Sequence, residues 1–192
     1  MDLGSFSYEL KKDESVKNME NQKELLLIRH AKSSWDKPLL GDRDRPLNKR
    51  GKRNIPVMGE RLSRNEWVPD LVVTSPAKRA RKTARGISRQ LRYPKKHIRV
   101  EEKLYTAEIM DLYTVLRSCS DQVRRLFLVG HNFVITDFAN DLASLDIDNI
   151  PTCGLVAIRF PVSSWTHIEP GCGELVFFDY PKKAESSGVD KV

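Results

Sequence analysis

Hydrophobic and polar positions alternate along this chain in blocks that predict strands and helices in turn. Three short apolar runs are suited to strands buried on both faces of a sheet. They lie at 25–28, 71–73 and 126–129. Elsewhere, apolar residues recur every three or four positions, as on one face of a helix. These stretches cover about 48–63, 75–91, 109–116 and 134–145. Because strands and helices alternate, we expect a three-layer α/β/α domain with a mainly parallel central sheet.

Local signals place several element boundaries. Asn48 is a suitable N-cap for the first helix, and Pro56 inside that helix should kink or split it. Ser75 as N-cap and Pro76 at the first helical position predict the start of the next helix. Further short strands are expected at 98–100, as an edge strand, and at 154–160 and 174–180.

The length of 192 residues, with 40% hydrophobic and 31% charged residues, is typical of one soluble domain. We expect a flexible N-terminal tail over 1–22, the domain over 23–182 and a loose C-terminal end over 183–192. The tail lacks the apolar core of a signal peptide, and no segment is apolar enough to span a bilayer. The three cysteines form no CxxC pair. A reduced, cytoplasmic protein is therefore expected.

Positive charge is concentrated in the domain. The net charge is +7, and residues 1–24 hold six acids and four bases, so the remainder carries +9. Such a surplus attracts phosphate, nucleic acid or an acidic protein face. Residues 78–99 contain ten lysines and arginines and no acid. We interpret this segment as the solvated face of an amphipathic helix rather than a nucleic-acid site, because only Tyr93 offers an aromatic ring for base stacking.

The residues directly after the three apolar runs carry the candidate chemistry. They are Arg29-His30, then Ser75 to Arg79, then Gly130-His131-Asn132. In open parallel sheets, ligands bind beyond the carboxyl ends of the strands. If the three runs are parallel neighbours, two histidines and two arginines meet at one edge of the sheet.

Two imidazoles and two guanidiniums favour phosphoryl transfer. Guanidinium groups match phosphate oxygens with paired hydrogen bonds, and a neutral imidazole is a competent nucleophile near pH 7. A second, protonated imidazole would stabilise the phosphoryl oxygens, which predicts a bell-shaped pH profile. Without a carboxylate cluster, a P-loop or a GxGxxG motif, neither a metal nor a nucleotide cofactor is expected.

Four motifs in this order resemble the histidine phosphatase superfamily, the phosphoglycerate-mutase-like group. Residues 27–33, Leu-Ile-Arg-His-Ala-Lys-Ser, are similar to its Arg-His-Gly signature, and residues 45–51 to its Leu-Thr-x-x-Gly segment. Residues 74–84 and 129–132 are similar to its second-arginine and second-histidine motifs. The Arg-His-Ala-Lys-Ser start and the Asp-Arg-Pro-Leu segment resemble the SixA-type phosphohistidine phosphatases. The resemblance covers about residues 24–181.

This resemblance implies a phosphoglycerate-mutase-like fold and roles for four residues. His30 would be the nucleophile that becomes phosphorylated. Arg29 and Arg79 would bind the phosphoryl oxygens, and His131 would bind the same oxygens and stabilise the transition state. Mutase-like members supply a proton from a glutamate between the second arginine and the second histidine. Glu108 is the favoured candidate for that general acid here.

The substrate is expected to be phosphohistidine on a protein. About 50 residues separate His30 from Arg79 and Arg79 from His131, which leaves little chain for a lid. A shallow, open pocket follows, unless the loop at 33–46 folds over the site. Asp42, Asp44 and Arg45 in that loop are interpreted as loop-ordering groups. The alternatives are a phosphatase for a small phosphomonoester and a non-catalytic phosphate-recognition module that keeps both arginines.

Overall fold

The computed structural model describes residues 22–184, and the structural statements that follow refer to this part of the chain. The expected N-terminal tail, apart from residue 22, lies outside the described residues, as do residues 185–192 of the expected loose end. Within the described part, no helix is both long enough and apolar enough to cross a membrane. Cys119 and Cys153 are buried, Cys172 is partly buried, and none forms a disulfide.

A six-stranded sheet forms the middle layer, in the order β3-β2-β4-β1-β5-β6. The strands are β1 (Lys23–Arg29), β2 (Leu71–Thr74), β3 (Ile98–Val100), β4 (Arg125–Gly130), β5 (Leu155–Phe160) and β6 (Glu174–Asp179). The first four are parallel, whereas β5 is antiparallel to β1 and β6 is antiparallel to β5. The expected mainly parallel sheet is confirmed, and β6 runs in the same direction as β1.

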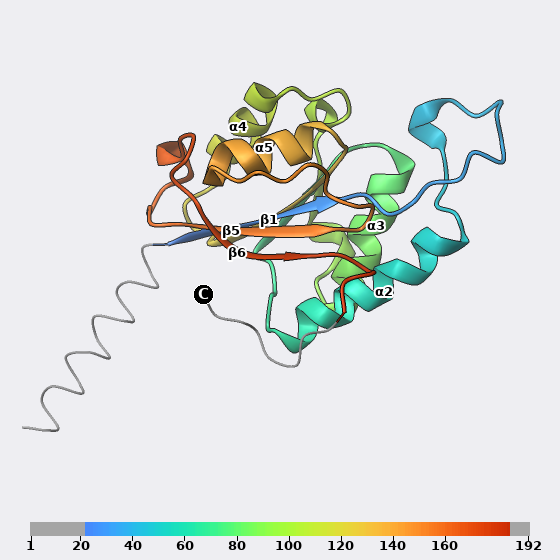
Figure 1. Ribbon diagram of the computed structural model, residues 1–192, viewed down its shortest axis with the longest axis horizontal. Helices are drawn as coiled ribbons and strands as arrows, with labels where there is room; N and C mark the ends of the chain where they lie inside the picture. Colours follow the sequence, from blue (N-terminus) through green and yellow to red (C-terminus); the bar gives the residue numbers. More distant parts are fainter. Residues whose placement is uncertain (1–21, 185–192) are drawn as a thin grey trace, which may run out of the picture.

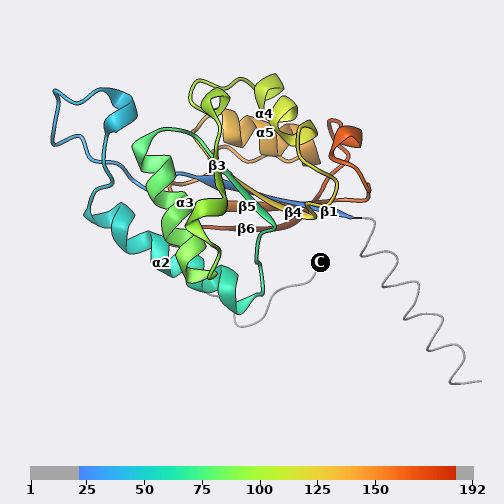
Figure 2. The same cartoon turned by 180° about the vertical axis from the view of Figure 1, so that it is seen from behind.

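Helices cover both faces of this sheet (Figures 1 and 2). One face packs against α2 (Lys49–Arg64) and α3 (Lys78–Gln90), and the other against α4 (Ile109–Arg117) and α5 (Val134–Ala143). The alternation of side chains along β1 serves both layers. Leu25 and Leu27 pack with α4 and α5, whereas Leu26 and Ile28 pack with α2 and α3. All four are at most 1% exposed, and burying each such side chain stabilises the fold by about 1.5–3 kcal/mol.

The first helix begins where the sequence predicts but does not break. The Asn48 Oδ1 accepts a hydrogen bond from the backbone N–H of Gly51 at 2.8 Å, so the predicted N-cap is confirmed. The expected split at Pro56 is wrong, since α2 runs unbroken from Lys49 to Arg64. Proline removes one donor, and the carbonyl that loses its partner belongs to Lys52, an exposed residue that water can reach.

The next helix begins later than expected. Its N-cap is Ala77, not Ser75, although the Ser75 Oγ accepts a hydrogen bond from the backbone N–H of Ala77 at 3.3 Å. Along α3, Ala80, Ala84 and Ile87 are buried. Lys82, Arg85 and Arg89 are exposed, as the solvated-face interpretation of residues 78–99 requires.

Candidate active site

Three chain segments meet at the carboxyl edge of the parallel strands. Strand β4 lies between β1 and β2, so the residues that follow these three strands are neighbours. The backbone N–H of His30 donates to the carbonyl of Gly130 at 3.0 Å, and that of Ser75 donates to Val129 at 3.0 Å. The sheet therefore brings His30, Ser75 and His131 to one place, as the strand-end argument predicts.

Arg79 bridges the two imidazole rings. Its Nε donates to His30 Nε2 at 3.2 Å, and its Nη2 donates to His131 Nδ1 at 3.3 Å. The ring centroids of His30 and His131 are 5.1 Å apart. Because a guanidinium only donates, both of these ring nitrogens carry lone pairs.

The tautomer of His30 is set by its own backbone neighbour. His30 Nδ1 lies 2.8 Å from the carbonyl oxygen of Ala31, so Nδ1 carries the proton and Nε2 the lone pair. Burial lowers the pKa of His30 to about 3, against the opposing effect of this hydrogen bond, and the positive charges nearby lower it further. The ring is therefore neutral at pH 7, as a nucleophile must be.

His131 is neutral as well. Its Nε2 lies 2.7 Å from Ser75 Oγ, and with Nδ1 accepting from Arg79 the Nε2–H donates to that hydroxyl. Burial lowers the pKa of His131 to about 4, and the charge of Arg79 adds to the effect. The expectation of a protonated His131 is therefore wrong for this state of the site. Arg79 already supplies a buried positive charge, and a second cation beside it would be repelled.

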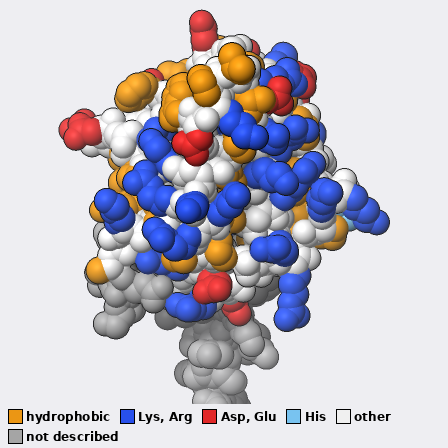
Figure 3. Space-filling view, turned by 90° about the vertical axis from the view of Figure 1, so that its right-hand side faces the viewer, with side chains coloured by type: hydrophobic (Ala, Val, Ile, Leu, Met, Phe, Trp, Pro, Cys, Tyr) orange, Lys and Arg blue, Asp and Glu red, His pale blue; other side chains and the backbone are white. Residues whose placement is uncertain are grey.

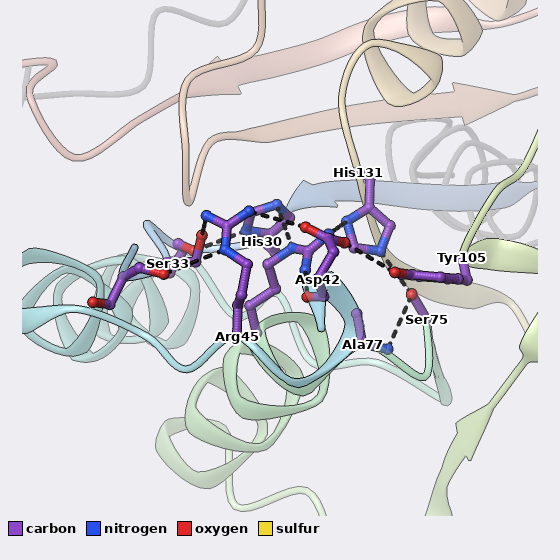
Figure 4. A network of polar contacts seen from close by, with 11 residues as sticks. His30, Ser33, Asp42, Arg45, Ser75, Ala77, Tyr105 and His131 are labelled. Atoms are coloured by element: carbon purple, nitrogen blue, oxygen red, sulfur yellow. Dashed lines mark hydrogen bonds and ion pairs between the residues drawn. The ribbon is translucent and has the colours of Figure 1, made fainter. Parts of the chain in front are cut away.

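A carboxylate from the loop at 33–46 also enters this network (Figure 4). Asp42, at the start of the short 3₁₀ helix Asp42–Asp44, accepts from Arg79 Nη2 at 2.9 Å, from the Tyr105 hydroxyl at 3.0 Å and from Arg45 Nη1 at 2.9 Å. Burial opposes ionisation of Asp42, but the hydrogen bonds from Arg79, Tyr105 and Arg45 outweigh it and lower its pKa to about 2. Asp42 is thus an ionised partner of Arg79 and not merely a loop-ordering group.

Arg45 attaches the same loop to the domain. Its Nη2 donates to Ser33 Oγ at 2.7 Å, and its guanidinium carbon lies 3.2 Å from the centre of the Trp35 ring. Arg45 itself is 8% exposed. The loop-ordering role expected for Arg45 agrees with these contacts. Since Asp42 also reaches Arg79, the loop folds against the site and does not leave it fully open.

Thr83 joins the nucleophile segment to the arginine helix. Its Oγ1 accepts from the backbone N–H of Ala31 at 3.0 Å and donates to the carbonyl of Arg79 at 2.8 Å. Thr83 is fully buried. This hydroxyl therefore fixes the distance between the chain after His30 and the first turn of α3. Sequence reasoning missed it, as it missed Tyr105.

The structure does not bring Arg29 into this network. Its Nη1 donates to Asn149 Oδ1 at 2.9 Å and to the carbonyl of Ile150 at 2.6 Å. Its positive charge nevertheless lies near enough to His30 to lower the pKa of that ring. A role for Arg29 in phosphate binding stays a prediction.

Glu108 also stays a prediction as general acid. It is the exposed N-cap of α4, and its backbone N–H donates to the Asp111 carboxylate at 3.0 Å. No hydrogen bond between described residues links its side chain to His30, Arg79 or His131. Tyr105 and Asp42, by contrast, reach Arg79 or its immediate partners.

Comparisons with known proteins place the chain in a family. The model of the histidine phosphatase superfamily (branch 1) matches residues 25–112. An uncharacterized protein of Mycobacterium tuberculosis is 33% identical over 167 residues, which cover 81% of this chain and all of that protein.

Solved structures share the fold. SixA from Agrobacterium tumefaciens, assigned as a phosphohistidine phosphatase, superposes with a TM-score of 0.70 at 25% identity, over 83% of this chain and 98% of that one. The mycobacterial glucosyl-3-phosphoglycerate phosphatase in complex with VO3 superposes with a TM-score of 0.60 at 14% identity, over 82% of this chain and 99% of that one. With its sequence motifs, its fold and the meeting of His30, Arg79 and His131 at one edge of the sheet, the chain belongs to the histidine phosphatase superfamily and shares the fold of its SixA-type members.

Proposed function

We propose that this protein is a phosphatase that forms a phosphohistidine intermediate on His30. The observation that carries the proposal is the pair of contacts at the His30 ring. Nδ1 is held by the Ala31 carbonyl at 2.8 Å, and the lone pair of Nε2 faces Arg79 at 3.2 Å. A neutral nucleophile beside an obligate cation suits attack on a phosphoryl group.

The reaction proceeds in two displacements. The Nε2 lone pair of His30 attacks phosphorus, and the bond between phosphorus and the leaving atom breaks, with its electrons going to the leaving group. A water molecule then attacks phosphorus, the bond from phosphorus to Nε2 breaks, and its electrons return to the ring as inorganic phosphate is released. Throughout, the N–H groups of Arg79 that now face the two rings donate to the phosphoryl oxygens. Besides the substrate and this water molecule, the proposed steps use only side chains of the protein.

We propose phosphohistidine on a protein as the substrate. The SixA-type fold supports this choice, and so does the ionisation of the site. Asp42 is the carboxylate bonded to Arg79, and with a pKa of about 2 it is ionised at neutral pH and cannot donate a proton. An imidazole leaves more easily than an alkoxide and needs less help from an acid. A phosphorus–nitrogen bond therefore matches the groups that the site provides.

A small phosphomonoester is the second candidate. The contact of Asp42 with Arg79 places the loop at 33–46 against the site, which narrows the approach for a large substrate. The glucosyl-3-phosphoglycerate phosphatase, whose name gives a small phosphorylated substrate, has the same fold, which supports this alternative.

Trapping tests the intermediate. The protein is incubated with a ³²P-labelled phosphohistidine peptide or with an aryl phosphate and quenched in alkali. We expect an acid-labile, alkali-stable label on His30, and loss of label and turnover in the His30→Ala variant. His97→Ala, which removes an exposed histidine, is the control and should keep both. Turnover that survives in the His30→Ala protein contradicts the mechanism. A wild-type protein that binds phosphate without label or turnover is the non-catalytic recognition module instead.

Comparing the two substrates tests the substrate class. We expect kcat/KM for the phosphohistidine peptide to exceed that for the aryl phosphate. The opposite order, together with turnover of sugar monophosphates, favours the small-molecule function.

A further inference from the structure

A basic cavity lies beside the candidate active site. It is open to solvent and has a volume of about 620 Å³, and the residues that line it include Arg29, Lys32, Arg50, Arg53, Tyr180 and Lys182. Among residues 22–184, no aspartate or glutamate lines it. A cavity of this size holds several side chains of a bound molecule.

The positive charges of this cavity are not neutralised by the domain. Over residues 22–184, the side chains of Lys32, Arg50, Arg53 and Lys182 form no hydrogen bond or ion pair. A second, smaller basic cavity of about 270 Å³ behaves differently. There Glu24 is 2.6 Å from Arg125 and 3.3 Å from Arg159, so a carboxylate of the protein itself offsets part of the charge. The larger cavity is therefore the one that is poised for an external anion.

The fold fixes this cavity next to the nucleophile. Arg29 and Lys32 flank His30 in sequence, and an extended residue spans at most about 3.6 Å, so the Lys32 backbone lies within about 7 Å of that of His30. The start of α2 packs directly on this segment, because the Asn48 N–H donates to the Lys32 carbonyl at 3.0 Å.

Besides the segment after β1 and the start of α2, the chain after β6 lines the cavity. Since β6 runs in the same direction as β1, Tyr180 and Lys182 emerge at the same edge as His30. Basic side chains are spread over the face of the molecule toward which β1 points (Figure 3).

We propose that this cavity binds an acidic segment of the protein substrate, next to the phosphohistidine that His30 attacks. The inference rests on the proposed function. The four uncompensated cations come from three separate chain segments, so the positive charge is spread along a length that several carboxylates of one peptide can occupy. Val57, Pro151 and Pro181 give the cavity apolar wall between the charges, which suits the aliphatic parts of a bound peptide. A substrate that pairs with these cations is held while its phosphoryl group reaches Arg79.

Two matched peptides test the proposal. Each carries one histidine phosphorylated with phosphoramidate, flanked by four glutamates in one peptide and by four glutamines in the other. Wild-type protein should hydrolyse the acidic peptide with a kcat/KM at least tenfold higher, mainly through a lower KM. The double variant R50Q/R53Q should reduce this preference to within about twofold and leave the neutral peptide unchanged. The control K49Q/K52Q removes two charges from the same helix, outside the cavity, and should keep the preference.

Each other outcome overturns the proposal. Equal hydrolysis of the two peptides by wild-type protein shows that the cavity takes no part. If R50Q/R53Q and K49Q/K52Q lose the preference for the acidic peptide equally, the preference comes from the overall positive charge of this face and not from the cavity. If hydrolysis of a hexose bisphosphate requires Arg50 and Arg53, and hydrolysis of the acidic peptide does not, the occupant of the cavity is a small molecule. In all three cases the neutral peptide still labels His30, so the proposed function stands. If wild-type protein hydrolyses none of the three substrates, the two peptides and the aryl phosphate, the proposed function itself is contradicted.

Discussion

Neutral, partly buried imidazoles make the free energy of unfolding of this protein depend on pH. The pKa of His30 is about 3 in the folded protein and near 6.5 in the unfolded chain. Between these two pKa values the unfolded state binds more protons than the folded state. The free energy of unfolding is therefore highest above pH 6.5 and falls as the pH is lowered below that value. At pH 5, which is 1.5 units below 6.5, the titration of His30 lowers the free energy of unfolding by about 2 kcal/mol, because one pH unit corresponds to about 1.36 kcal/mol. His131, with a pKa of about 4, costs a similar amount.

Urea unfolding at pH 8 and pH 5, at constant ionic strength, measures this loss. We expect the wild-type free energy of unfolding to fall by about 4 kcal/mol if the two rings act independently, a large part of the usual 5–15 kcal/mol. The His30→Gln and His131→Gln variants each lack one titrating ring, so each should lose about 2 kcal/mol less than wild type over the same interval. Asp42, with a pKa of about 2, stays ionised in this window and does not interfere.

The comparison between proteins carries the test, since other groups titrate alike in all of them. If His30→Gln loses as much stability as wild type between pH 8 and pH 5, His30 titrates near its ordinary pKa. The neutral, desolvated nucleophile inferred from the structure would then be wrong.

Three other substitutions give separate tests. Asp42→Asn removes the carboxylate that holds Arg79, so we expect inorganic phosphate to inhibit the variant at about three- to tenfold lower concentration; weaker inhibition would mean that Asp42 mainly orients Arg79. Thr83→Val keeps the shape but leaves the Ala31 N–H without its partner, and should destabilise the fold by about 1–3 kcal/mol in thermal or urea unfolding, with kcat reduced. Gly51→Ala places a Cβ against the Lys32 carbonyl and should lower the melting temperature, whereas Gly41→Ala, with open space around it, should not.

The sequence predicts the scaffold well because the signals are local. Four apolar residues at 25–28 can be buried only in the middle of a layered sheet, and Asn48 caps the helix that follows it as expected. Pro56 misleads because the penalty of an internal proline falls on one exposed carbonyl, while Ile55, Met58 and Leu62 remain packed.

The site is less predictable where side-chain direction matters. The meeting of His30 and His131 follows from their places directly after two apolar strands, whereas the motif resemblance selects Arg79. Arg29 stands at the same strand end, but its guanidinium donates to Asn149 and to the Ile150 carbonyl, which no local signal indicates. Ser75 looks like a helix cap because its hydroxyl suits one, and only the folded chain shows that the hydroxyl faces His131. Tyr105 carries no local signal, since it reaches Asp42 through a contact between residues 63 positions apart.

The carbonyl of Ala31 has a consequence for the chemistry of labelling. By holding the proton on Nδ1, it leaves one ring nitrogen of His30 able to form a bond to phosphorus. The modified enzyme should therefore be a single regioisomer, with the phosphoryl group on the nitrogen remote from the main chain, and a backbone oxygen, not the reactivity of imidazole, selects it.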